Sequence, residues 1–445
     1  MCFFLSVFIS YIFIMNIFQT LTCFLMSTCS TTAVIDIGPS QVHLALGEND
    51  GEMVVSWADS IARNGSIVQW GEKSDELEWE SPGYLRVFGK SRRQQYAYWA
   101  VMKDLQPNTR YYYRVGSGET MTQIFYFTTF PANDSKWAPN ICIYGDLGIK
   151  NGVSIPLLNN KTLEGFFDLI IHVGDIAYDL YNNNGQRGDA FLTAIEPMAS
   201  RVPYMVIPGN HEYFPFFGDS GENYQNRFKM PGDSNDMYKF RVSNIQFFVV
   251  STEFYYYIEG GTPKKVKKQL EWLEEELKEA NKKEVRDEYP WIIVLGHRPL
   301  YCTNNKPGRC SGGGTWLREG SLFMGDGFEN IFYKYGVTAY ICGHNHHYER
   351  TIPMYQFGYD SLNEPYLNPN MTVYIVTGAA GNSEGIDSFK KESPTWTGFR
   401  HKDYGFSRII PHNSSHLQFE HISALTDQVV DSFYLVQYRH GMFAR

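Results

Sequence analysis

A series of short apolar runs, each ending abruptly at a glycine, constrains this chain more than any other feature of its sequence. The runs occupy residues 140–144, 167–173, 203–208, 290–295, 337–342 and 372–377. Polar residues that follow them include Asp146, Asp175, Asn210, His297 and His344. Apolar residues at helical spacing lie between some runs, most clearly over residues 266–280. Buried strands that alternate with helices indicate an α/β domain, whose ligands bind outside the carboxyl ends of the strands. We therefore expect these polar side chains to meet at one site.

Each of these motifs is a weak signal when taken alone. A Gly-Asp pair is usually a turn, and a Gly-His pair is more often a hydrogen-bonded core histidine than a ligand. The whole set is more informative, because every motif follows a strand-like run and carries a residue type that binds metals. A metal site is therefore the better interpretation.

The first part of the chain has a different pattern. Residues 34–131 contain strand-like runs separated by Gly, Asn, Asp and Pro, which indicates an all-β domain. A Leu and a Pro lead into a Tyr-rich run near Tyr111, as in the tyrosine corner of fibronectin type III sandwiches, and Trp57 is the expected core aromatic. After a polar linker at 132–137, the second domain should span residues 138–440.

Composition and charge narrow the class of protein. The chain has 445 residues, a formal net charge of −9 and an estimated pI of 5.8. Its length suits two or three domains, and an acidic surface argues against nucleic acid as a partner. Residues 1–30 contain no Asp, Glu, Lys or Arg and are mostly apolar, which predicts a signal peptide, with an uncleaved membrane anchor as the alternative.

The expected location is therefore extracellular or a lumen of the secretory pathway, such as a lysosome-like compartment, with no membrane contact after cleavage. Sequons at Asn64, Asn133, Asn160, Asn370 and Asn413 suit a secreted glycoprotein. Among the cysteines beyond residue 30, Cys302 and Cys310 flank a polar loop and are the favoured disulfide. Cys142 and Cys342 are expected either as buried thiols or as a second bridge.

The motifs also resemble a known family. Asp146-Leu-Gly148, Gly174-Asp175, Gly209-Asn210-His211-Glu212, Gly296-His297 and Gly343-His344-Asn-His346 resemble, in this order, the calcineurin-like metallophosphoesterases. Tyr178, three residues after Asp175, is typical of the purple acid phosphatases within that superfamily. The resemblance covers nearly the whole chain beyond residue 30 and is closest to the animal two-domain iron/zinc form. It implies an α/β (α+β) domain with two mixed sheets flanked by helices.

The resemblance implies a ligand set for two metals. Fe(III) would be held by Asp146, Asp175, Tyr178 and His346, an anionic set that suits a hard trivalent ion. Zn(II), or else Fe(II) or Mn(II), would be held by Asp175 as a bridge together with Asn210, His297 and His344. The implied activity is hydrolysis of small phosphate monoesters through attack by a metal-bound hydroxide, which explains an acid optimum. His211 would be the general acid.

Some residues near these motifs receive other interpretations. His172 is expected as a strand histidine, and His347 is given no metal role. Glu349 and Arg350 are expected to shape the pocket. Plant relatives carry histidines in the loop that follows His297, whereas residues 301–310 contain none; their role would fall to Tyr301, Asn304, Lys306 or Arg309, or be absent.

Two alternative functions stay open at this point. One is a phosphodiesterase on the same scaffold, and the other is a secreted binding protein without catalytic activity. The sequence leaves the oligomeric state and the physiological ester undetermined.

Overall fold

The computed structural model describes residues 38–89, 93–132, 137–213, 220–256, 262–306, 313–323, 325–360 and 363–443. The predictions for the signal peptide at 1–30, the sequon at Asn133 and the loop residues Arg309 and Cys310 lie outside these residues. Among the helices described, none combines the length and apolar character needed to cross a membrane.

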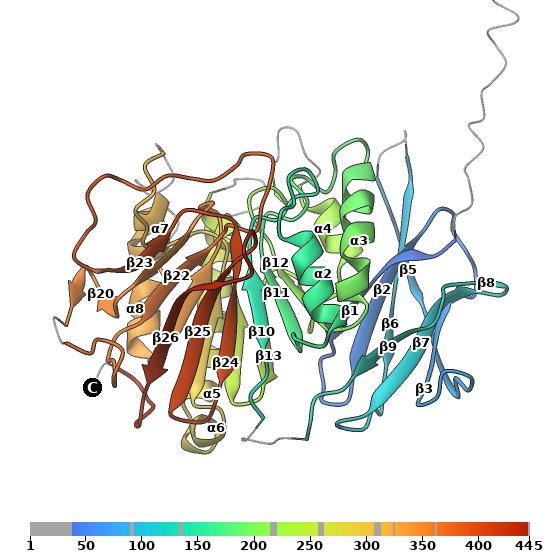
Figure 1. The fold of residues 1–445 in the computed structure, drawn as a ribbon, viewed down its shortest axis with the longest axis horizontal. Coiled ribbons are helices and arrows are strands. Elements are labelled where there is room, and N and C mark those ends of the chain that lie inside the picture. Colours follow the sequence, from blue (N-terminus) through green and yellow to red (C-terminus); the bar gives the residue numbers. More distant parts are fainter. Residues whose placement is uncertain are drawn as a thin grey trace, which may run out of the picture. The chain divides into compact units, whose positions relative to one another are not determined.

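The N-terminal part is all-β, as predicted (Figure 1). One sheet has the order β1 (Ser40–Leu46), β2 (Met53–Asp59), β6 (Gln95–Met102), β5 (Tyr84–Phe88). The other has the order β4 (Trp79–Pro82), β3 (Ile67–Gly71), β7 (Arg110–Ser117), β8 (Thr120–Met121), with β9 (Phe125–Thr128) also paired to β7. Trp57 is 1% exposed and stacks on Tyr98, and the Tyr111 hydroxyl accepts a bond from the Gln106 amide at 2.9 Å. These contacts confirm the expected core aromatic and tyrosine corner.

The remainder contains two mixed sheets, which confirms the predicted fold class. The six-stranded sheet has the order β12 (Tyr204–Ile207), β11 (Leu169–Val173), β10 (Ile141–Tyr144), β24 (Gly405–Pro411), β25 (His416–Ser423), β26 (Val429–Val436). The seven-stranded sheet has the order β13 (Tyr238–Val242), β14 (Ile245–Val249), β15 (Trp291–Leu295), β18 (Ala339–Cys342), β22 (Val373–Thr377), β19 (Tyr348–Thr351), β23 (Thr397–His401). Strands β10, β11 and β12 are mutually parallel, as are β14, β15, β18 and β22.

Two short hairpins complete the strands: β16 (Gly320–Ser321) with β17 (Gly325–Asp326), and β20 (Met354–Tyr355) with β21 (Gly358–Tyr359). Within the described residues the helices are α2 (Ile155–Leu163), α3 (Gln186–Ala199), α4 (Glu222–Arg227), η1 (Thr252–Tyr255), α5 (Pro263–Ala280), α6 (Lys283–Glu288), α7 (Gly313–Glu319) and α8 (Glu329–Lys334).

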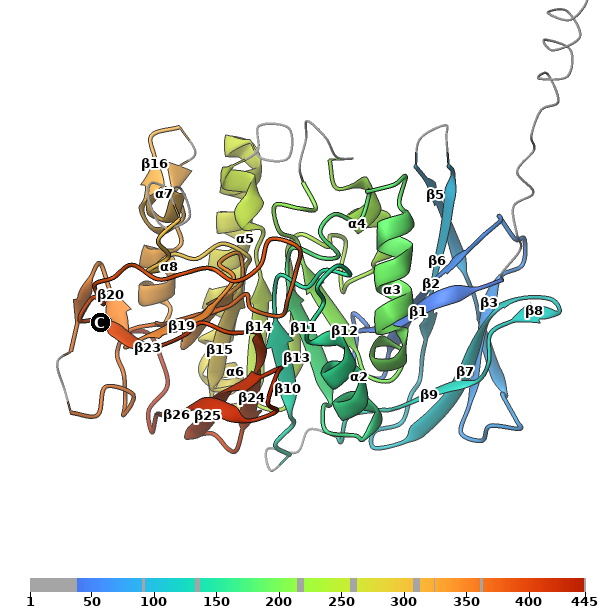
Figure 2. The same cartoon turned by 45° about the horizontal axis from the view of Figure 1, so that its top comes forward.

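Helix α5 covers the predicted periodic segment, and its buried residues are Val266, Gln269, Leu270, Leu273, Leu277 and Ala280. Its apolar side chains share a core with β14, β15 and β18, while a second core joins both sheets to α2 and α3. Figure 2 shows α2 and α3 along the six-stranded sheet and α5 along the seven-stranded one.

The structure decides between the two states that the sequence left open for Cys142 and Cys342, buried thiols or a second bridge. Cys142 on β10 and Cys342 on β18 are free, buried thiols. Cys302 is disulfide-bonded, while its predicted partner Cys310 lies outside the described residues.

Candidate metal centre

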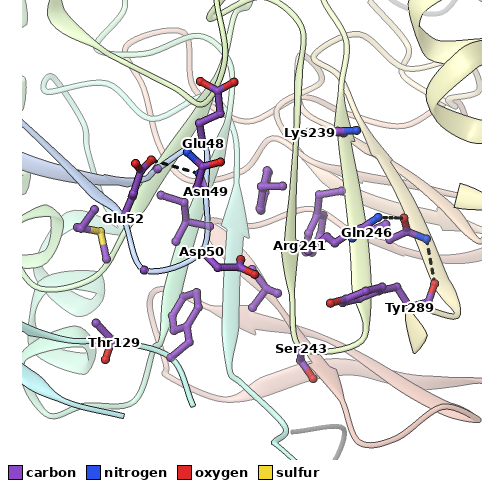
Figure 3. Close-up of a pocket in the computed structure, with 18 of the residues that line it drawn as sticks. Glu48, Asn49, Asp50, Glu52, Thr129, Lys239, Arg241, Ser243, Gln246 and Tyr289 are labelled. Carbon is purple, nitrogen blue, oxygen red and sulfur yellow. Dashed lines mark hydrogen bonds between the residues drawn. The ribbon is translucent and has the colours of Figure 1, made fainter. Parts of the chain in front are cut away.

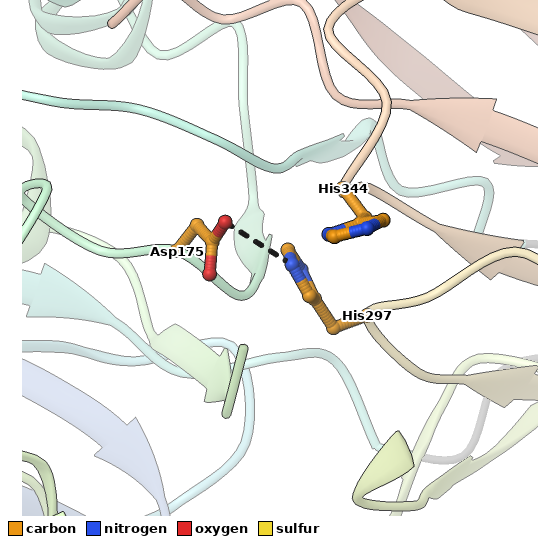
Figure 4. A group of neighbouring side chains, drawn as sticks. All are labelled: Asp175, His297 and His344. Carbon is orange, nitrogen blue, oxygen red and sulfur yellow. Dashed lines mark ion pairs between the residues drawn. The ribbon is translucent and has the colours of Figure 1, made fainter. Parts of the chain in front are cut away.

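The ends of the parallel strands bring the predicted polar residues together from both sheets. Asp146, Asp175 and Asn210 follow β10, β11 and β12, and His297 and His344 follow β15 and β18. Ligand atoms of Asp175, His297 and His344 lie within 4.8 Å of one another (Figure 4). The carboxyl ends of the parallel strands therefore carry a candidate metal site, where the sequence pattern predicted one.

One group contains Asp146, Tyr178 and His346, all almost fully buried. The Tyr178 hydroxyl lies 2.7 Å from His346 Nε2 and 3.1 Å from Asp146 Oδ1. His346 Nδ1 contacts the Gly385 carbonyl at 2.9 Å, so Nδ1 carries the proton and the Nε2 lone pair faces the two oxygens. Asp146 also accepts the His344 amide at 2.7 Å, which ties this group to the next.

The second group contains Asp175, Asn210, His297 and His344. His297 Nδ1 contacts the Val173 carbonyl at 2.8 Å, so its Nε2 faces Asp175 Oδ2 at 3.2 Å and Asn210 Oδ1 at 3.3 Å. The rings of His297 and His344 are 5.1 Å apart.

These contacts bring together carboxylate, phenol, amide and imidazole groups: the Tyr178 hydroxyl donates to Asp146, and His297 pairs with Asp175. Asp175 Oδ2 is buried and forms an ion pair with His297 Nε2. Although burial alone would lower the pKa of His297, the charge of Asp175 outweighs it and raises that pKa to about 9. The site therefore attracts positive charge, and carboxylate, phenol, amide and imidazole donors fit metal ions.

The backbone at these positions is held in a conformation that non-glycine residues rarely adopt. Asp146, Asp175, Tyr178 and His344 have φ values of 62°, 57°, 49° and 67°. Such left-handed residues cost about 1–3 kcal/mol each and cluster at functional sites. The loops thus place side chains at some cost in stability.

His211 lies beside this arrangement rather than within either group. Its Nδ1 is 2.5 Å from Asp179 Oδ1, and its ring packs 4.3 Å from that of Tyr178. Its Nε2 lies 3.8 Å from Asp175 Oδ2 and 3.6 Å from Glu384 Oε1. Burial opposes protonation, but Asp175 and Asp179 outweigh it and raise the pKa of His211 to about 10. His211 can therefore hold a proton at the edge of the site.

Sequence reasoning gave no role to Glu212, which braces two of the loops. Its carboxylate accepts backbone amides of Asp175 at 2.9 Å, Ile176 at 2.8 Å and Gly209 at 2.7 Å. Burial, with the charge of Asp175, raises its pKa to about 8. Its place in the Gly-Asn-His-Glu motif was the only signal that could have found it.

Asp179, Glu384 and Asp387 were also missed. Asp387 Oδ2 accepts the His346 amide at 3.1 Å and the Asn304 side chain at 2.6 Å. Glu384 Oε2 is 4.0 Å from His346 Nε2 and is the most exposed of these carboxylates. Their spacing from the motifs follows no simple rule, so only the folded loops reveal them.

The residues with other predicted roles lie away from both groups. His172 contacts the Tyr204 hydroxyl at 2.8 Å, and burial lowers its pKa to about 3, as suits a strand histidine. His347 lies 3.5 Å from Glu349, which accepts the Thr303 amide at 2.9 Å. Glu349 therefore holds the loop that follows His297.

Of the candidates in that loop, Tyr301 donates to buried Glu329, and Lys306 pairs with Asp387. Arg350 Nε donates to Asp431 at 2.6 Å. This contact does not give Arg350 the predicted role in shaping the pocket. These side chains form internal contacts in the structure.

A separate cavity of about 700 Å³ lies between the β1–β2 turn and strands β13 and β14 (Figure 3). Its wall includes Glu52, Lys239, Arg241, Gln246 and Tyr289. The Gln246 amide donates to the Tyr289 carbonyl at 3.0 Å. None of the predicted site residues lines this cavity, so it is distinct from the candidate metal centre.

Family models match this chain in succession. Residues 39–129 match the family described as purple acid phosphatase, N-terminal domain. Residues 140–348 match calcineurin-like phosphoesterase, and residues 371–432 match iron/zinc purple acid phosphatase-like protein C.

Individual relatives match over almost the same extent. A Danio rerio protein named acid phosphatase type 7 is 38% identical over 430 residues, covering 93% of this chain and 95% of the relative. The Homo sapiens protein of that name is 36% identical over 407 residues, covering 90% and 91%. The solved structure of purple acid phosphatase PPD1 from yellow lupin (Lupinus luteus) seeds has a TM-score of 0.75 at 26% identity, covering 91% of this chain and 76% of that one.

Proposed function

This chain belongs to the purple acid phosphatase family and is a phosphatase, and on this basis we propose that it hydrolyses small phosphate monoesters at a dinuclear metal centre. The observation that carries the proposal is the pair of neighbouring groups in which imidazole nitrogens face carboxylate, phenol and amide oxygens. The proposed ligands of Fe(III) are Asp146, Asp175, Tyr178 and His346. Those of a divalent ion, Zn(II) or else Fe(II) or Mn(II), are Asp175, Asn210, His297 and His344.

When bound, the two metals supply Lewis acidity and an acidified water as the nucleophile. The chain's own residues then act on the substrate. His211 carries a proton on both ring nitrogens, because Asp175 and Asp179 stabilise its charged form. Nδ1 donates to Asp179, and Nε2 gives its proton to the leaving oxygen. The Tyr178 ring packs against His211 and limits its rotation. Glu212 fixes the backbone of the loops that carry Asp175 and Asn210.

Metal analysis and paired assays of the purified protein test the proposal. We expect iron together with a divalent metal, a visible absorption band, and a higher kcat/KM for an alkyl phosphate monoester than for the matching diester. Asp175→Asn should lose both metals, whereas His346→Ala should lose iron alone. Protein without bound metal would favour the binding-protein alternative, and a preference for the diester would favour the phosphodiesterase.

We also propose that the chain is secreted or enters a lumen of the secretory pathway. The uncharged apolar composition of residues 1–30 and the disulfide at Cys302 support this location. N-terminal sequencing of protein collected from the medium of expressing cells should begin after residue 26 or beyond. Retention of the whole chain inside cells with a reduced Cys302 would contradict it.

A further inference from the structure

Arg298, the residue after His297, is built into the wall of the candidate metal centre. Its backbone amide donates to Thr252 Oγ1 at 3.1 Å, and its carbonyl accepts the Tyr340 hydroxyl at 2.7 Å. Both ends of the residue are thus fixed. Because it lies at the carboxyl end of β15, its side chain begins at the edge of the site.

The guanidinium is also held in place. Nε lies 2.9 and 3.0 Å from the two carboxylate oxygens of Glu253, and Nη2 lies 2.9 Å from one of them. The Glu253 side chain is 1% exposed, and the ring of Tyr256 covers a face of the guanidinium at 4.1 Å. The Arg298 side chain keeps 15% exposure. A cation fixed in this way is preorganised for an anion.

The remaining nitrogen, Nη1, points to the candidate metal centre and lies 3.3 Å from His344 Nε2. Nη1 can only donate, so this contact needs a lone pair on Nε2. A neutral histidine that ligates a metal uses one ring nitrogen for the metal and carries its proton on the other. Whether Nε2 binds the metal or carries the proton, it cannot accept a hydrogen bond. Metal binding at His344 therefore removes this hydrogen bond and leaves the Nη1 N–H of Arg298 directed at the site.

We propose that Arg298 is a substrate-binding residue that donates from Nη1 to a phosphate oxygen and thereby favours monoesters over diesters. The inference rests on the proposed phosphatase function of the same site. Arginine forms strong, directional hydrogen bonds with phosphate. A monoester has one more non-bridging oxygen and one more negative charge than a diester, so a fixed cation contributes more to its binding.

The structure also gives other contacts to three of the four loop residues considered from the sequence, while the fourth, Arg309, lies outside the described residues. Tyr301 is hydrogen-bonded to Glu329, and Asn304 and Lys306 both contact Asp387. Each of these three side chains already contacts another side chain of the protein. Arg298 directs a nitrogen at the site.

The test compares two variants of the metal-loaded protein, Glu253→Gln and Glu253→Gln/Arg298→Gln. The single variant keeps the guanidinium, and the double variant removes it without leaving a buried carboxylate unpaired. Calorimetry measures the affinity for inorganic phosphate, mass spectrometry measures the metals, and kcat/KM is measured for a monoester and its matching diester. We expect the double variant to bind phosphate about 10- to 100-fold more weakly than the single variant, with both metals retained. The ratio of monoester to diester kcat/KM should fall by a similar factor.

Unchanged phosphate affinity and unchanged monoester preference would overturn the inference and leave Arg298 as a structural partner of Glu253. Loss of the divalent metal from the double variant would also overturn it, because Arg298 would then support His344 instead of substrate. If the double variant does not fold, Arg298→Lys supplies the same comparison with wild type. Metal-loaded wild-type protein without monoesterase activity would refute the phosphatase proposal itself, which separates the two failures.

Discussion

Replacing Asp179 by Asn tests whether this carboxylate acts through His211. Asp179 Oδ1 lies 2.5 Å from His211 Nδ1, and both side chains are more than four-fifths buried. Asn keeps the size and one oxygen acceptor but removes the negative charge. His211 should then stay in place but hold its proton less tightly, because Asn stabilises the charged imidazolium less than Asp does, so the pKa of His211 should fall.

The structure sets the expected size of the effect. A hydrogen bond to a charged partner contributes about 1.5–3 kcal/mol, against about 0.5–1.5 kcal/mol for a neutral pair. The difference, about 1.5 kcal/mol, corresponds to a fall of about one unit in the pKa of His211, and so to about a tenfold loss of kcat at pH values above that pKa, when proton transfer to the leaving group limits the rate. Nitrophenyl phosphate, whose leaving group needs little protonation, should lose less than about threefold. Metal content should not change.

A double-mutant cycle with His211→Ala gives the decisive assay. If Asp179 acts through His211, Asp179→Asn should reduce kcat on an alkyl phosphate by less than about twofold in the His211→Ala background. Asn182→Ala is the matched control, since it removes a 2.8 Å bond to Asp179 but keeps the carboxylate. Equal losses of kcat with and without His211 would refute the reasoning and mean that Asp179 instead stabilises its loop.

Three further changes probe the site and its surroundings. Tyr178→Phe should abolish the visible band while iron stays bound; a coloured variant would mean that Tyr178 is no iron ligand. Glu212→Gln leaves buried amides without an acceptor and should lower the free energy of unfolding in urea by about 2–3 kcal/mol and weaken metal binding; unchanged values would contradict the bracing role. His172 has a folded pKa of about 3, below the unfolded value near 6.5, so the unfolded chain takes up the proton first as the pH falls. The contribution of neutral His172 to the free energy of unfolding is present above pH 6.5, and about 2 kcal/mol of it is lost between pH 7 and pH 5. His172→Gln should remove that loss, and an unaltered pH dependence of unfolding would exclude it.

The sequence predicted most of the architecture because its strongest signals are local. A buried strand is an unbroken apolar run, and the residue at its carboxyl end is set by position alone. For this reason the sequence alone predicts that Asp146, Asp175 and His297 lie at one edge of the fold. The sandwich was predictable from alternating strands and from the turn that precedes Tyr111.

Residues whose roles depend on how loops fold were not predictable in this way. Glu212 reaches amides 36 and 37 positions earlier in the chain, and Arg298 contacts Glu253 and His344, which are 45 and 46 positions away. No period in the sequence encodes such distances. The free state of Cys142 was open for a similar reason, because it depends on the sheet positions of β10 and β18.

None of the proposed metal ligands lies in the N-terminal domain, yet this domain braces the loop that holds Tyr178. Buried Arg227 donates to Gln41 of β1 at 3.1 Å and to the Gly185 carbonyl, which precedes α3, at 2.9 Å. Near the start of α3, Arg187 donates to the Tyr178 carbonyl. Because Tyr178 adopts a left-handed backbone conformation that costs about 1 kcal/mol or more, its loop needs support from residues around it. The sandwich thus contributes to the site through this chain of contacts, although none of its residues is a proposed ligand.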